Sequence, residues 1–169
     1  MLTVRAMTHS DVSDVYRIET QSFRMPWSKK SLLSEVDNNL AHYLIAQEDK
    51  KVVGYCGMWV LFDECHITNI AVDPLYRHKG YGKSLLYAAM AVGDLFGATA
   101  MTLEVRETNR IAQEMYNKFD FEKQGFRKRY YQDTGEGAIL LWNTNLQRTL
   151  KNNACIQDSF ALQWETFEK

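Results

Sequence analysis

The sequence predicts a mixed α/β (α+β) fold, in which roughly six to seven strands form one central mixed sheet flanked by about four helices. Three observations predict it. Strand-like and helix-like segments alternate along the chain, two early strands are separated by a short polar turn at 48–51, and a long helical segment links two later strands. The chain has 169 residues, of which 46% are hydrophobic, so it can bury one core of ordinary size and has little room for a second.

The first elements are a strand and two helices. Residues 2–7 alternate between apolar and polar, as a half-buried strand does. Thr8 and Asp11 have the spacing of a capping box, which predicts a helix that starts there and ends before Pro26. Ser28 can cap a second, short helix.

Three strands and a long helix follow. Residues 43–47 and 52–61 have the pattern of two hairpin strands, and residues 65–72 form a third strand that ends at Asp73-Pro74. The apolar spacing over residues 82–96 indicates an amphipathic helix, for which Gly97 is a natural stop.

The last predicted elements are a strand at 98–105, a helix at 109–119 that starts from an asparagine cap, and two paired strands at 121–131 and 138–142. The strands on either side of the long helix form a crossover unit. We therefore expect them to be parallel, connected with right-handed topology, and central in the sheet.

The composition excludes several classes of protein. Lys and Arg total 20 against 21 for Asp and Glu, so no overall positive field would hold the chain on nucleic acid or anionic lipid. Cys56, Cys65 and Cys155 are odd in number and lack metal-ligand spacing, which predicts reduced thiols and no metal site. There is no basic leader and no apolar run of about 18 residues. We expect a cytoplasmic protein that binds neither nucleic acid nor membrane.

A basic, glycine-containing loop connects the third strand to the long helix. Two glycines would let a phosphate approach main-chain N–H groups, with the helix dipole behind them. The spacing fits neither a Walker loop, which would need glycine in place of Arg77, nor a dinucleotide fingerprint, which would need it in place of Leu85. The strand–loop–helix context favours an anion site over a simple turn. The loop and first helical turn comprise Arg77, His78, Lys79, Gly80, Tyr81, Gly82, Lys83 and Ser84.

The strand after the long helix carries a carboxylate in a costly position. Leu103 and Val105 share one face of this strand, and Glu104 takes the other. A central strand is covered on both faces, so Glu104 must line a wet cleft or be paired, with Arg106 or a lysine as the structural alternative. His66 is a further candidate base, although a lone strand histidine is more often structural.

The next helix offers a phenol. Asn109, Ala112 and Tyr116 are separated by three and four residues and so form one stripe, beside an apolar stripe that includes Met115. A helical tyrosine is more often packing than catalytic, so the spacing alone leaves both roles open for Tyr116.

The pattern Arg/Gln-x-x-Gly-x-Gly/Ala, matched by Arg77, Gly80 and Gly82, resembles the acetyl-CoA loop of the GNAT family of N-acetyltransferases. Further segments resemble, in the same order, the RimI type of that family, the bacterial ribosomal-protein-alanine N-acetyltransferases. The resemblance extends over residues 1–144, which it identifies as a GNAT domain, and leaves residues 145–169 as a C-terminal extension of unknown role. The segments are Pro26-Trp27-Ser28, Asn69-Ile70-Ala71-Val72-Asp73-Pro74, Leu103-Glu104-Val105-Arg106, the set Asn109, Ala112 and Tyr116, and Tyr130-Tyr131.

This resemblance implies a GNAT fold and acetyl-CoA as the co-substrate, with no metal. By that similarity Glu104 corresponds to the base and Tyr116 to the acid, while the amides of residues 78–83 bind the pyrophosphate. The backbone of Ile70, Ala71 and Val72 pairs with the pantetheine arm. Other residues implied at the cofactor are Arg77, Ser84, Asn109 and Ala112, and those implied at the peptide are Phe23, Trp27, Tyr130 and Tyr131, each of which has the alternative of being an ordinary loop or edge aromatic.

We therefore expect an enzyme that acetylates a protein N-terminal α-amine, with the N-terminal alanine of a small-subunit ribosomal protein as acceptor, acting as a monomer or weak dimer. The alternatives are a small-molecule amine or a lysine as acceptor, and a non-catalytic acyl-CoA-binding module, which would need neither the carboxylate nor the phenol.

Three departures from the family pattern bear on the turn beside the cofactor and on peptide specificity. Asp120 replaces a common glycine, Gly137 stands where aspartate is typical, and Gln132 replaces a common proline.

Overall fold

The computed structural model describes residues 1–168 and confirms the mixed α/β fold class. Its α-helices are α1 (Val12–Ser22), α2 (Lys29–Val36), α3 (Tyr81–Leu95), α4 (Arg110–Lys118) and α5 (Leu146–Asn152). Its strands are β1 (Leu2–Ala6), β2 (Ala41–Glu48), β3 (Lys51–Leu61), β4 (Glu64–Val72), β5 (Ala100–Arg106), β6 (Glu122–Arg127), β7 (Ala138–Asn143) and β8 (Phe160–Leu162). Short 3₁₀ helices occur at η1 (His9–Asp11), η2 (Pro74–Tyr76), η3 (Ala154–Ser159) and η4 (Trp164–Phe167). No helix within this described range is both long enough and apolar enough to cross a membrane.

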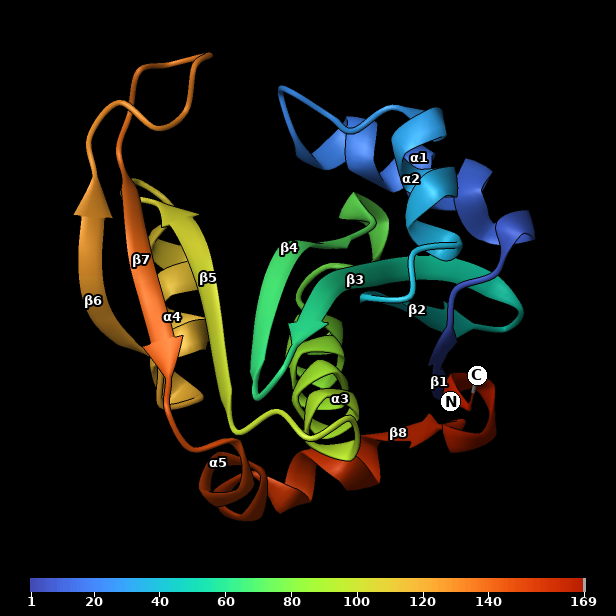
Figure 1. Cartoon of the computed structure of the whole chain (residues 1–169). Coiled ribbons are helices and arrows are strands. Elements are labelled where there is room, and N and C mark those ends of the chain that lie inside the picture. Colours follow the sequence, from blue (N-terminus) through green and yellow to red (C-terminus); the bar gives the residue numbers. More distant parts are fainter. Residues whose placement is uncertain (169) are drawn as a thin grey trace.

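The strands form one eight-stranded sheet in the order β6-β7-β5-β4-β3-β2-β1-β8 (Figure 1). β4 and β5 are parallel neighbours in the middle of the sheet, joined through α3 as the predicted crossover requires. The sheet has one strand more than expected because β8, from the C-terminal extension, pairs in parallel with β1. β6 is shorter than the strand predicted over 121–131. It ends at Arg127, and the chain turns away near Arg129, whose φ is 51°.

Two hydrophobic cores lie on opposite faces of the sheet. α3 and α4 cover one face, here called the α3 face, where Leu85 and Met90 pack among buried side chains of β3, β4 and β5. α1 and α2 cover the other, here called the α1 face, with Val15, Ile18 and Leu32 in its core. The helices predicted on either side of the hairpin strands therefore sandwich the sheet.

A β-bulge at Thr68 changes which β4 side chains point to each face. Gly57 of β3 lies opposite Asn69, whereas the next residue, Met58, lies opposite Ile67, so Thr68 has no partner on β3. Successive strand residues face opposite sides, and one extra residue therefore shifts the alternation. Ile67 packs toward the α3 face, whereas Thr68 and Asn69 both form hydrogen bonds on the α1 face.

The C-terminal segment, residues 145–168, packs along α3 and covers the β1 edge of the sheet. Leu146 is fully buried in the core of the α3 face. Phe160 packs edge-on against Tyr87 of α3, with ring centroids 6.2 Å apart. The main-chain N–H of Ala6 donates to Thr166 Oγ1 at 2.9 Å, so β1 is held on this side by both β8 and η4.

Asp120, one of the departures noted above, joins the turn after α4 to this segment. Its φ is 60°, in the left-handed region where glycine is usually found but aspartate is tolerated. Asp120 Oδ2 accepts a hydrogen bond from Thr149 Oγ1 at 2.7 Å, and Thr149 Oγ1 accepts one from Asn143 Nδ2 at 2.7 Å. The carboxylate thus supplies an anchor for α5 that glycine could not.

We expect Asp120→Ala to lower the free energy of unfolding by about 1.5–3 kcal/mol, because a hydrogen bond to a charged acceptor is lost and alanine is strained at this φ. Asp120→Gly should be less damaging by about 1 kcal/mol, since glycine adopts the same φ without strain. Urea unfolding followed by circular dichroism measures both changes. Equal losses in the two variants would show that the left-handed backbone contributes nothing.

Candidate active site

β4 and β5 separate toward their C-terminal ends, and the gap between them is the centre of the candidate site. Their pairing extends no further than His66 and Thr102 in the described chain. Figure 1 shows the two strands parting beyond this point. The bulge at Thr68 bends β4 locally, which favours this separation. The main-chain edge of residues 70–72, expected to meet the pantetheine arm, therefore has no strand partner on the β5 side.

The loop between η2 and α3 presents a row of main-chain amides. His78 and Gly80 are both left-handed, with φ of 64° and 83°, and Gly80 is the N-cap of α3. Among the described residues, the N–H groups of residues 78–82 have no hydrogen-bond acceptor, whereas those of Lys83 and Ser84 donate to the Gly80 carbonyl oxygen at 3.0 and 3.1 Å. Free N–H groups at the positive end of a 15-residue helix attract an anion. Of the amides predicted to bind the pyrophosphate, 78–83, that of Lys83 also forms a hydrogen bond within the first helical turn.

Two side chains of this loop are bound to a carboxylate on β2. Lys79 Nζ lies 3.4 Å from Glu48 Oε2, and the Tyr81 hydroxyl donates to Glu48 Oε1. This carboxylate offsets part of the positive charge that the sequence places in the loop. Lys79 is therefore partly neutralised, whereas the main-chain amides of residues 78–82 have no acceptor among the described residues.

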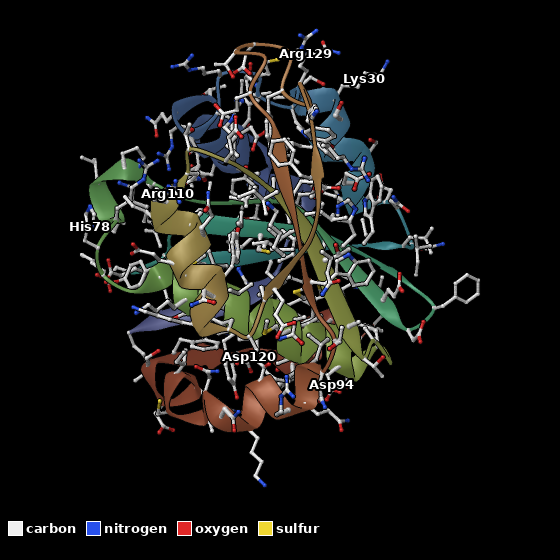
Figure 2. The ribbon with its side chains drawn as sticks, turned by 90° about the vertical axis from the view of Figure 1, so that its left-hand side faces the viewer. Lys30, His78, Asp94, Arg110, Asp120 and Arg129 are labelled. Atoms are coloured by element: carbon white, nitrogen blue, oxygen red, sulfur yellow. The ribbon has the colours of Figure 1, made fainter. Side chains whose placement is uncertain are left out.

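The other side chains of the loop take separate positions. Arg77 Nε donates at 3.1 Å to the carbonyl oxygen at the end of β4, which fixes the loop against that strand. The Ser84 hydroxyl lies 3.3 Å from Ser159 Oγ of the C-terminal segment. His78 is at the outer margin of the molecule (Figure 2), and Lys83 is also exposed.

Glu104 lies on β5 and is held by a histidine from β4. Its Oε2 is 2.8 Å from His66 Nε2, and its Oε1 is 3.9 Å from Arg127 Nη2. The hydrogen bond from His66 outweighs burial and lowers the pKa of Glu104 below its ordinary value, so the carboxylate is ionised at neutral pH. The structural alternative of a pair with Arg106 is wrong, because Arg106 is bound to Asp133 at 2.9 Å. Glu104 and His66, the two residues that the sequence offered as candidate general bases, thus form one hydrogen-bonded pair.

Tyr116 lies on α4, whose first turn is capped as predicted: Asn109 Oδ1 accepts from the Ala112 N–H at 3.2 Å. The Tyr116 side chain belongs to the core of the α3 face, is 5% exposed, and packs edge-on against Phe121. Its hydroxyl makes no hydrogen bond with any described residue. Burial raises the pKa of Tyr116 above its ordinary value, so the phenol keeps its proton at neutral pH. Tyr116 is therefore a packed side chain with a free hydroxyl.

Tyr131 lies within electrostatic range of both groups. Burial raises the pKa of Tyr131 to about 12, and the charge of Glu104 contributes to the rise. Tyr131 in turn contributes to the raised pKa of Tyr116. The Arg106 guanidinium lies over the Tyr131 ring at 3.9 Å from its centroid, and Tyr130 packs edge-on against it at 5.1 Å. Tyr131 is thus coupled electrostatically to both the carboxylate and the phenol, and Tyr130 packs against Tyr131.

A cleft of about 230 Å³ opens between the end of α1, the end of β5 and the β6–β7 loop. Of the aromatic residues expected at the peptide, Phe23 lines this cleft. Trp27 instead packs against the core of the α1 face, and only its main chain reaches toward Glu19. The β5–β7 pairing brings together the segments that carry the polar residues from 106 to 136, and the end of α1 supplies the others, so no local sequence signal marks the set. The lining residues are Ser22, Phe23, Arg24, Arg106, Thr108, Thr134 and Glu136.

Glu19 is a buried carboxylate that the sequence did not mark, because it lies between apolar positions of an ordinary amphipathic helix. It is 1% exposed, and burial raises its pKa. Its oxygens accept from the Trp27 N–H at 3.0 Å and from Asn69 Nδ2 at 3.3 Å. Asn69 also donates to the Tyr55 hydroxyl and accepts from Thr68 Oγ1. This network fixes the loop after α1 to the β4 bulge.

Of the other two departures from the family pattern, the structure explains Gly137 but not Gln132. A Cβ atom at Gly137 would lie 2.1 Å from the Phe126 ring, so the usual aspartate could not be placed there without moving that ring. Nothing in the structure explains Gln132, which is exposed.

The fold and this site define an acetyltransferase, and the chain belongs to the acetyltransferase (GNAT) family, whose model matches residues 12–121. It is 42% identical over 142 residues to a Bacillus subtilis (strain 168) protein named as a candidate ribosomal protein bS18-alanine N-acetyltransferase, covering 83% of this chain and 94% of that one. It is 30% identical over 143 residues to the ribosomal protein bS18-alanine N-acetyltransferase of Escherichia coli (strain K12), covering 83% and 96%. The crystal structure of the E. coli ribosomal-protein-S18-alanine N-acetyltransferase superposes with a TM-score of 0.79 at 29% identity, covering 84% of this chain and 92% of that one.

Acetyl-CoA, the acetyl donor of this family, fits the residues present. The unengaged amides of residues 78–82 suit its diphosphate, and the unpaired edge of β4 at 70–72 suits the amide groups of its pantetheine arm. In the described part of the chain, no group of three or more His, Cys, Asp or Glu side chains could hold a metal ion.

Proposed function

We propose that this chain acetylates the N-terminal α-amine of a protein in the cytoplasm, and that its acceptor is the N-terminal alanine of ribosomal protein bS18. The observation that carries the proposal is the Glu104 carboxylate, held by His66 at 2.8 Å on the strand that ends at a polar cleft. An open cleft suits a chain terminus. The relatives that share this activity by name match along 94% and 96% of their own lengths, so they contain no large domain that this chain lacks.

An α-amine suits a weak base. Its ordinary pKa of about 7.7–8.0 leaves roughly a tenth of it neutral near pH 7, whereas lysine, with a pKa of about 10.4, is neutral in fewer than about one molecule in a thousand. Glu104, whose pKa is lowered, is a weak proton acceptor. A site built on such a carboxylate therefore favours an α-amine over a lysine side chain.

In the proposed mechanism each group of the chain has one task. Acetyl-CoA supplies an acetyl group activated as a thioester. The amides of residues 78–82 hold its diphosphate, and residues 70–72 hold its arm along β4. Glu104 accepts the first proton that the acceptor ammonium loses, directly or through water. The neutral amine would then form the C–N bond as the C–S bond of the thioester breaks, with Tyr116 donating its phenolic proton to the departing sulfur and the second N–H proton passing to solvent. Tyr116 then regains a proton from solvent.

Mass spectrometry after incubation with acetyl-CoA tests the acceptor. The acceptors are peptides that differ only in their first residue, an N-terminally blocked peptide with one lysine, and a polyamine. We expect one acetyl group on the N-terminus of the alanine peptide and little on the other acceptors. Acetylation of the polyamine or the lysine alone would refute the protein N-terminus as acceptor, and hydrolysis or binding of acetyl-CoA without transfer to any amine would refute the enzyme.

A further inference from the structure

We propose that His66 is a positioning residue for acetyl transfer: its imidazole fixes one oxygen of the Glu104 carboxylate and leaves the other turned toward the acceptor. This inference deepens the proposed function and rests on Glu104 being the base. The Glu104 carboxylate is ionised and can only accept hydrogen bonds, so the 2.8 Å contact requires His66 Nε2 to carry the hydrogen and donate it.

The placement of His66 follows from the strand arrangement. It is the last residue of β4 that pairs with β5, opposite Thr102, and Glu104 lies two residues further along β5, at the start of the gap. His66 precedes the bulge and so shares the α1 face with Glu104. The Trp59 ring lies edge-on to the imidazole, with centroids 6.3 Å apart, which limits how far the ring can turn.

Glu104 needs such a partner because little else holds its side chain. Past Thr102, β5 has lost β4 as a neighbour, and the remaining pairing with β7 fixes the main chain but not the carboxylate. Among the described residues, the side chains in contact with the Glu104 carboxylate are His66 on β4 and Arg127 on β6, while Tyr131 interacts with it only electrostatically. Arg127 is 3.9 Å away with its side chain 55% exposed, so it is a weak restraint. Only the His66 contact is within hydrogen-bond distance and partly shielded, with side chains 35% and 14% exposed.

The chain offers a matched control pair. His9 Nε2 lies 2.8 Å from Asp37 Oδ1, the same distance as in the site, but both side chains are largely exposed, at 61% and 68%, and they lie outside the gap. A histidine–carboxylate contact is thus present in two settings. Removing the exposed one tests what loss of such a pair does when no reaction depends on it.

The first test compares steady-state kinetics of His66→Leu, His66→Gln and His9→Leu with the alanine peptide. We expect His66→Leu to lower kcat on the order of 10-fold to 100-fold, the usual effect of a small misplacement of a reacting group, with an unchanged KM for acetyl-CoA. His66→Gln should recover most of the rate, because its amide N–H can donate from nearly the same position. His9→Leu should match the wild type. An unchanged kcat in His66→Leu, or a Gln variant as slow as the Leu variant while both remain folded, would overturn the proposal.

The second test needs no acceptor, so it separates this proposal from the proposed function. Titration of the Glu104 carboxyl carbon by NMR, assigned with Glu104→Gln, should show the pKa of Glu104 rising in His66→Leu and staying low in His66→Gln and His9→Leu. If the wild type titrates as expected but acetylates no peptide, the acceptor assignment fails and the pairing stands. If the titration of Glu104 is the same in all variants, His66 does not hold the carboxylate and the proposal fails.

A double-mutant cycle then links the pairing to the reaction. In the Glu104→Gln background, His66→Leu should have little further effect on kcat, because the group it positions is already absent. Losses that multiply instead would show that His66 acts apart from Glu104 and would overturn its role as a positioning residue.

Discussion

Tyr116→Phe is expected to lower kcat by roughly 10²-fold to 10⁴-fold, the usual contribution of a positioned general acid, and to leave the affinity for acetyl-CoA almost unchanged. The variant removes a single oxygen, which forms no hydrogen bond with the described residues, so its loss leaves no partner unsatisfied. The ring that packs against Phe121 stays in place. Single-turnover kinetics measure the chemical step, and calorimetry measures acetyl-CoA binding.

Tyr87→Phe is the matched control for this prediction. Tyr87 is buried in the same core, also 5% exposed, but its hydroxyl lies 3.4 Å from Gln157 in the C-terminal segment. We expect this variant to keep the wild-type rate. Equal rates for Tyr116→Phe and wild type would remove the acid role and leave Tyr116 as a packing residue.

Glu104→Gln is expected to lower kcat/KM by about 10²-fold near pH 7, with a loss that shrinks as the pH rises past about 8. The sign follows from the two titrating groups. The pKa of Glu104 is below its ordinary value, so the wild-type carboxylate is charged throughout the neutral range and gains nothing at higher pH. The acceptor amine does lose its proton there, and a neutral amine needs no base. A pH series with an alanine peptide, from about 6 to 9.5, measures the convergence of the two enzymes.

Glu64→Gln is the control for the loss of a carboxylate on a neighbouring strand. Glu64 lies at the opposite end of β4, where it pairs with β5 and is exposed. We expect its profile to match that of the wild type at every pH. A loss in Glu104→Gln that stays constant across the series would indicate a structural role for Glu104 instead of a base.

Local patterns in the sequence predict most of the fold. The capping residues, the polar turn at 48–51 and the strand–loop–helix order each depend on neighbours within a few positions, and the elements form where these patterns place them. The bulge at Thr68 has no such signal, because it depends on the register that β4 adopts against β3. The parallel strand at 160–162 was missed for a similar reason: a three-residue strand is too short to show alternation, and it forms only because β1 offers an unpaired edge.

The residues of the candidate site also fall into those that a local sequence pattern predicts and those that depend on contacts between distant segments. Gly80 and the amides of its loop can be expected from sequence because their chemistry is that of one short segment. The pair of His66 and Glu104 joins residues 38 positions apart, and it depends on the bulge, on the parallel register of β4 and β5, and on where the two strands part. Glu19 is hidden for a different reason, since its partners belong to β4 and to the loop after its own helix.

The pairing of β1 with β8 places the first and last strands of the chain side by side at one margin of the sheet, three and four strand positions from β4 (Figure 1). At about 4.8 Å per strand, β1 and β8 are roughly 14 and 19 Å from β4, which borders the gap. A fusion partner or a surface linker attached at either end would therefore extend away from the opening that a peptide must enter. Enzyme tethered to a bead or a sensor chip by its tail should still be able to turn over free peptides.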